Sequence, residues 1–279
     1  MSSAFYIKRR LSAKANEEKQ RATEEKILKL LGMLAIISIL SGICAAEETE
    51  YYDWKGSQLY ASKNYTDALA YFDQAVAQDP GYVNSWVHKG DAQRALKDFN
   101  GSIQSYYAAL QLDGNQVAAW SGIAESYMAA KDYSNASIAA ARSTELDNKS
   151  KYYWYREGNL LQLQEMYEES VAKYDGALAL DPKYKEALYR KGVSQMTLGK
   201  YEDARGLFDQ VLEVDPNFKQ AYLASGLALQ ADGKYVEAQQ EYDKALQIDP
   251  AYSPALISKM HVLLALKKTD EALQMFLKI

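Results

Sequence analysis

Six aromatic residues recur along this chain at a constant interval of 34 residues. A fixed period between about 20 and 50 residues is typical of repeat proteins, in which each unit buries its apolar face against its neighbours. A column of six aspartates keeps the same interval, and two columns in step exclude coincidence. The period therefore predicts stacked repeats, which favour a binding surface over an active site. The columns are Tyr65, Phe99, Tyr133, Tyr167, Tyr201 and Tyr235, and Asp79, Asp113, Asp147, Asp181, Asp215 and Asp249.

Each unit has the pattern of a helix, a tight turn and a second helix. Its eighth and twentieth positions are small and its fourth and twenty-fourth are bulky, as Gly192, Ala204, Leu188 and Phe208 illustrate. Alternating large and small residues predict helix faces that interlock. Most units close with an aspartate and a proline, and proline disfavours the α conformation in the residue before it. The predicted repeats are 49–82, 83–116, 117–150, 151–184, 185–218, 219–252 and a partial unit 253–279.

This pattern resembles the tetratricopeptide repeat family over residues 49–279. The resemblance implies an all-α, right-handed superhelical solenoid of antiparallel helix pairs, whose inner groove binds partner proteins or peptides. Repeat 117–150 departs from the pattern, with Ala140 where a bulky aromatic is expected and Asn148 in place of the proline. The clearest copy, 185–218, shows Gly192, the turn Gly199-Lys200-Tyr201, then Ala204, Phe208 and Asp215-Pro216.

The family geometry also implies which residues face the groove. It places the second, fifth, sixth, ninth and twelfth positions of each first helix on the concave wall. The stretch richest in tyrosine and arginine lies in repeats 151–184 and 185–218, and these two residue types are frequent interface hot spots. The alternative is that the tyrosines only cover neighbouring helices. The predicted partner-binding residues are Tyr152, Tyr155, Arg156, Asn159, Tyr189 and Arg190.

The chain before the repeats carries a basic segment and then an uncharged one. Residues 1–29 hold eight Lys or Arg and four Glu, whereas residues 30–46 have no charge. A spanning helix needs about 20 residues, with a range of roughly 17 to 25. Residues 30–46 are therefore a transmembrane signal-anchor, a signal peptide cleaved beyond Cys44 and Ala46, or a buried soluble helix. Basic residues stay on the cytoplasmic side, so we expect the repeats to be extracytoplasmic, either anchored by this one span or secreted.

Four Asn-X-Ser/Thr sequons fall at predicted turns or unit boundaries, where a glycan would leave the core undisturbed. Turn composition is the alternative explanation, because turns favour Asn and Ser. The possible glycosylation sites are Asn64, Asn100, Asn135 and Asn148.

Catalytic chemistry finds little support. His88, His261 and Cys44 are the only histidines and cysteine, too few for a zinc site of the usual kind. We therefore predict no enzymatic activity, no metal and no cofactor. The repeats carry most of the acidic charge, which argues against nucleic acid as a ligand. The sequence favours a protein-interaction scaffold; the alternative is an accessory subunit that binds a small ligand or glycan for an associated enzyme or transporter.

The last unit, 253–279, either acts as a cap or docks through its open face on another chain, and we expect self-association or partner docking. Residues Val262 to Leu266 form an apolar run, and the sequence finishes at Phe276-Leu277-Lys278-Ile279, where a repeat array usually has a polar capping helix.

Overall fold

The structure is a computed structural model that describes residues 29–33 and 46–276. The predicted basic segment 1–29, except for its last residue, and most of the predicted membrane segment 30–46 lie outside the described residues. Within the described ranges, no helix has the length and apolar character needed to cross a bilayer.

The chain divides into two compact units, and the boundary falls inside α3 (Val83–Ala95). The first unit ends at Ala92. Its described part contains a helix over residues 46–61, α2 (Tyr65–Gln78) and most of α3. Phe72 is buried there between Ala68 and Ala92, so an aromatic side chain against small residues forms the centre of this unit.

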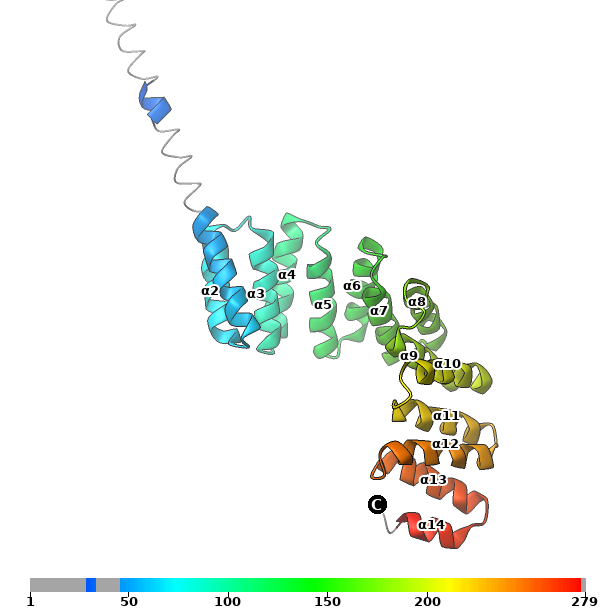
Figure 1. Ribbon diagram of the computed structural model, residues 1–279. Helices are drawn as coiled ribbons and strands as arrows, with labels where there is room; N and C mark the ends of the chain where they lie inside the picture. Colours follow the sequence, from blue (N-terminus) through cyan, green and yellow to red (C-terminus); the bar gives the residue numbers. More distant parts are fainter. Residues whose placement is uncertain (1–28, 34–45, 277–279) are drawn as a thin grey trace, which may run out of the picture. The chain divides into compact units, whose positions relative to one another are not determined.

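The second unit, from Gln93, is a series of helix pairs (Figure 1). Each helix packs against the next in the chain, and α7, α9, α11 and α13 also contact one another in that order. This arrangement confirms the predicted all-α array of helix pairs. After the end of α3 come α4 (Phe99–Leu112), α5 (Val117–Ala129), α6 (Tyr133–Leu146), α7 (Lys151–Leu163), α8 (Tyr167–Leu180), α9 (Lys185–Thr197), α10 (Tyr201–Val214), α11 (Lys219–Ala231), α12 (Tyr235–Ile248), α13 (Ser253–Ala265) and α14 (Thr269–Phe276).

Glycine and aromatic side chains interlock within several pairs. A Cβ atom added to Gly192 would lie 2.5 Å from Cε1 of Phe208, well inside contact distance. Gly158 meets Tyr174 and Gly226 meets Tyr242 in the same way. The glycine therefore lets the aromatic ring of the second helix lie directly against the backbone of the first.

The turn within each pair contains a residue in the left-handed conformation. Glycine adopts it freely, whereas a residue with a Cβ atom pays about 1–2 kcal/mol. Only two of the turns in the described residues use glycine. The residues at positive φ are Lys63, Lys97, Lys131, Glu165, Gly199, Gly233 and Lys267.

A lysine clamp closes three successive pairs. The first residue of α9, Lys185, donates to the carboxylate of Asp215 at 2.8 Å, and its Nζ lies 4.9 Å from the ring centre of Phe218. The hydrogen bond from Lys185 holds the pKa of Asp215 below its usual value. The equivalent clamps are Lys151 with Asp181 and Tyr184, and Lys219 with Asp249 and Tyr252.

Candidate functional site

A groove of about 590 Å³ opens in the second unit between the end of α3, the start of α4, α5 and α7. It contains four of the six predicted binding residues, all from α7. They are spaced at i, i+3, i+4 and i+7, so they share one face of the helix. The lining residues are Arg94, Ala95, Lys97, Phe99, Glu125, Met128, Ala129, Tyr152, Tyr155, Arg156 and Asn159.

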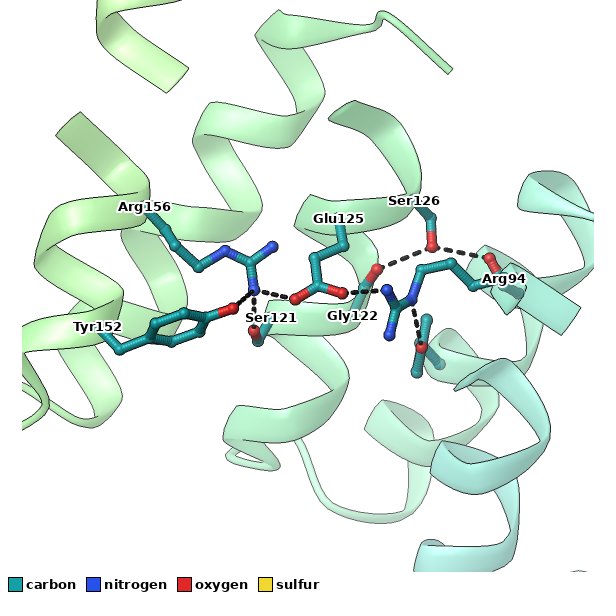
Figure 2. Close-up of polar contacts among 9 residues, drawn as sticks. Arg94, Ser121, Gly122, Glu125, Ser126, Tyr152 and Arg156 are labelled. Carbon is teal, nitrogen blue, oxygen red and sulfur yellow. Dashed lines mark hydrogen bonds and ion pairs between the residues drawn. The ribbon is translucent and has the colours of Figure 1, made fainter. Parts of the chain in front are cut away.

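Glu125 of α5 is the centre of a charged network in this groove. One carboxylate oxygen pairs with Arg94 and the other with Arg156, so two arginines flank one acid (Figure 2). The Glu125 side chain is 20% exposed and that of Arg156 is 13% exposed. Low exposure strengthens charge-assisted hydrogen bonds, and the network therefore holds both arginines in fixed positions.

Arg156 is fixed from three sides. Besides Glu125, its Nη1 donates to the hydroxyls of Ser121 and Tyr152, each at 3.1 Å, and its guanidinium lies 5.1 Å from the Tyr152 ring centre (Figure 2). All these hydrogen bonds use Nη1. The Nε and Nη2 groups have no hydrogen-bond partner in the described part of the chain. A planar guanidinium with unused N–H groups is suited to a carboxylate ligand.

Apolar surface adjoins these charges. Tyr152 is 47% exposed, and Phe99 and Met128 also line the groove. Tyr155 has a second role, because its ring packs against Tyr184 at 5.2 Å and Tyr174 at 6.1 Å between ring centres. The groove thus combines positive charge with aromatic area.

Asn159 also connects the groove to the core. Its side-chain oxygen accepts a hydrogen bond of 2.9 Å from the hydroxyl of Tyr174, and burial raises the pKa of Tyr174 well above its usual value. Asn159 is therefore held by a neutral tyrosine at physiological pH.

The other two predicted residues, Tyr189 and Arg190 of α9, do not line this groove. Tyr189 packs against Phe208 and Phe218, with ring centres 5.9 Å and 5.3 Å apart, and burial raises its pKa. Arg190 is exposed, and its Nη1 lies 3.5 Å from Oε1 of Gln162. Their role in binding stays a prediction.

The predicted set of binding residues omits several residues that line the groove. Arg94 and Met128 occupy the twelfth position of their repeats and Glu125 the ninth, so the rule for inward-facing columns places all three on the concave wall. Lys97 and Phe99 belong to the turn and the start of α4, outside those columns. Lys97 has a φ of 65°, and a lysine in the sequence does not predict this left-handed conformation.

The four sequon asparagines are exposed, as a glycan would require. Two of them already use their amide groups, because Asn64 donates to Asp67 and Asn135 to Asp132, each at 2.7 Å. Glycosylation stays a prediction. No group of three His, Cys, Asp or Glu side chains in the described ranges could hold a metal ion.

Comparison with known proteins gives a consistent result. Two family profiles described as tetratricopeptide repeat match the chain, one over residues 55–117 and 189–253 and the other over residues 229–279. Together these ranges cover more than half of the sequence. No curated protein sequence matches the chain.

Solved structures share the fold. YrrB, described as a TPR protein with an unusual peptide-binding site, is 21% identical, with a TM-score of 0.61 over 67% of this chain and 97% of its own. MamA is 26% identical over 59% of this chain and 96% of its own, with a TM-score of 0.56. A tetratricopeptide repeat protein from Parabacteroides merdae is 16% identical over 83% and 92%, with a TM-score of 0.64. The first and third of these likenesses show the fold alone.

Proposed function

Because the chain belongs to the tetratricopeptide repeat family, we propose that it is a non-enzymatic scaffold that binds an extended segment of a partner protein in the groove between α5 and α7. The observation that carries this proposal is the fixed position of Arg156. Its Nη1 is held by Glu125, Ser121 and Tyr152, while Nε and Nη2 make no hydrogen bond with the described residues and the adjacent Tyr152 ring is exposed. A side chain that is already ordered loses little entropy when it binds a ligand.

The charges of the groove select the chemistry of the ligand. Arg94, Lys97 and Arg156 oppose the single carboxylate of Glu125, so the lining residues carry a net charge of +2. The chain as a whole carries −5. A local positive patch on an acidic protein attracts acidic segments and repels basic ones. The partner segment therefore carries an acidic side chain that reaches Arg156 and an apolar side chain that lies against Tyr152.

The test is a paired comparison of two double variants. Tyr152→Ala/Arg156→Gln removes the aromatic surface and the guanidinium, whereas Tyr107→Ala/Arg142→Gln removes an exposed tyrosine and an exposed arginine that do not line the groove. Partners are captured through a photo-crosslinking residue at Met128 and identified by mass spectrometry. We expect affinity for the captured segment to fall at least about tenfold in the first variant only.

Equal affinity of the groove variant and the wild-type chain would contradict the proposal. Enrichment of glycans or small ligands instead of proteins would favour the accessory-subunit alternative. Circular dichroism of both variants establishes that the helices remain intact.

We also propose that the repeats lie outside the cytoplasmic membrane, either anchored by residues 30–46 or released after cleavage. The basic residues that precede this segment support the orientation, since eight Lys or Arg lie in residues 1–29 and Glu47, Glu48 and Glu50 follow the uncharged stretch. The test is protease treatment of intact cells that express the chain with a C-terminal tag. Loss of the tag is expected, or its appearance in the medium after cleavage; a tag that survives until the membrane is opened would overturn the orientation.

A further inference from the structure

A second hollow, of about 210 Å³, lies among α6, α7 and α8. None of its lining residues lines the groove. Trp154 and Glu157 project into it from α7, and successive helical residues are rotated by about 100°, so these two lie on the face of α7 opposite Tyr152 and Arg156. The lining residues are Ala141, Thr144, Glu145, Asn148, Trp154, Glu157 and Lys173.

Glu157 is the unusual residue of this hollow. Its side chain is only 5% exposed, and Oε1 accepts a hydrogen bond of 2.7 Å from Nζ of Lys173. The second oxygen, Oε2, is buried and has no hydrogen-bond partner among the described residues. A buried charged oxygen without a donor is costly, which makes Oε2 a position where an additional donor would stabilise the protein.

Ion pairs at other joints between repeats indicate which kind of donor would suit Oε2 of Glu157. At three other joints, an aspartate of one second helix pairs with a lysine 16 residues later on the next first helix. At the joint between α6 and α7, Ala141 and Glu157 occupy these two positions. The paired residues elsewhere are Asp73 with Lys89 at 2.8 Å, Asp175 with Lys191 at 2.6 Å and Asp243 with Lys259 at 2.5 Å.

This joint therefore has the carboxylate on α7, and α6 carries no lysine to pair with it; the ammonium that contacts Glu157 comes from Lys173 of α8 instead. The equivalent hollow between α12 and α13, about 350 Å³, is lined by the Asp243–Lys259 pair, so the hollow at this joint differs in its charges and not in being present. The hollow is larger than the cavity of about 150 Å³ that can hold a benzene-sized molecule, so an alkyl chain fits.

We propose that this hollow binds a primary ammonium group, which donates to Oε2 of Glu157. Two carboxylates and one lysine line the hollow, a net charge of −1 that a bound cation neutralises. The indole of Trp154 already lies 5.3 Å from the ammonium of Lys173 and favours cations near its face. The ammonium group belongs to a lysine side chain of a partner or to a free alkylamine, which present the same chemistry.

The experiment follows the indole N–H resonance of Trp154 in the full-length chain, identified with the Trp154→Phe variant, during titration with n-butylammonium. Saturable shifts are expected for n-butylammonium, but not for n-butanol or for sodium chloride at the same ionic strength. Spermidine and a lysine-containing tripeptide form two further arms, and the tighter binder identifies the source of the ammonium group.

Three variants test the site itself. Glu157→Gln keeps the shape and removes the charge, and should weaken binding at least tenfold. Ala141→Leu fills the hollow and keeps the carboxylate, and should also abolish the shift. Ala141→Asp/Glu157→Lys restores the pair of the other joints, and should no longer bind while the helical signal is retained.

Glu169→Gln is the matched control, because Glu169 is an exposed carboxylate of α8 that does not line the hollow. It should retain most of the affinity. The proposal is overturned if n-butanol and n-butylammonium give the same shifts, if no amine binds, or if Glu157→Gln binds as tightly as the wild-type chain.

Discussion

Repeats 117–150 and 185–218 have the same architecture, two helices joined by a tight turn, but different side chains form their cores. In the first, α6 buries Ala139, Ala140 and Ser143, whereas in the second α10 buries Leu207, Phe208 and Val211. The turn of the first repeat places Lys131 at positive φ, and that of the second uses Gly199. Repeat 185–218 also has the clamp between Lys185 and Asp215, where Val117 stands in repeat 117–150.

This difference coincides with the location of both candidate sites. Glu125 and Ser121 of the irregular repeat fix Arg156 in the groove, and its Ala141 lines the hollow beside Glu157. In repeat 185–218, an inward position contributes to packing instead, because Tyr189 packs against Phe208. Both candidate sites thus include side chains of the repeat that departs from the pattern at Ala140 and Asn148.

The largest effect is expected from Phe208→Ala, which gives α10 the alanine that α6 has at Ala140. Phe208 is fully buried, so the change should cost about 3–5 kcal/mol of local stability. Hydrogen exchange of the amides in α9 and α10 measures it without assuming that the array unfolds in one step. The control is Phe276→Ala at the same repeat position, where the side chain is 62% exposed and the change should stay within about 0.5 kcal/mol. Equal losses of stability in Phe208→Ala and Phe276→Ala would show that burial of the aromatic ring does not distinguish the two positions.

A second prediction concerns the contact between Gly192 and Phe208. The Gly192→Ala substitution forces the aromatic ring or a helix to move, and should destabilise the repeat by about 1–3 kcal/mol. Gly206→Ala in α10 is the matched control, since no atom lies within 4 Å of its added Cβ. There the substitution should stabilise the repeat by about 1 kcal/mol. Urea unfolding measures the change in the free energy of unfolding of each variant. A stabilising Gly192→Ala would show that the close contact between Gly192 and Phe208 is not needed.

The turn of the irregular repeat can be improved. Lys131 has a φ of 63°, a conformation that costs a residue with a Cβ atom about 1–2 kcal/mol. We expect Lys131→Gly to raise stability by about 1 kcal/mol and Lys131→Ala to leave it nearly unchanged, as measured by thermal unfolding. If both variants gave the same stability, the turn conformation would not separate the two repeats.

The smallest effect is expected at the clamp. Lys185 lowers the pKa of Asp215 from the ordinary value of 3.8, so the pair stabilises the folded chain above about pH 3.8 and loses this contribution as the pH falls through the lower folded pKa. In Lys185→Met, the pKa of Asp215 should rise toward 3.8 and this acid dependence should weaken, because the backbone N–H of Asn217 still donates to the carboxylate. NMR titration of the carboxylate measures the pKa. Val117→Met, at the equivalent position without a clamp, should leave the acid dependence unchanged, and an unshifted Asp215 in Lys185→Met would refute the clamp.

Part of the groove could be predicted because the repeat spacing places inward-facing residues at fixed positions. This reasoning identified Tyr152, Tyr155, Arg156 and Asn159 of α7. It did not predict that Tyr189 packs against Phe218, at the end of the same repeat. It also could not identify Lys97 and Phe99, whose positions depend on the path of a turn.

The helices, their pairing and the turns between them follow from the 34-residue period with its alternating large and small positions. Which side chains meet across repeats follows only from the packing of the repeats on one another. Arg156 contacts Ser121 and Glu125, which lie 35 and 31 residues earlier in the chain. Whether such distant side chains meet depends on the stacking of successive pairs, and stacking also left Oε2 of Glu157 without a protein donor in the described residues.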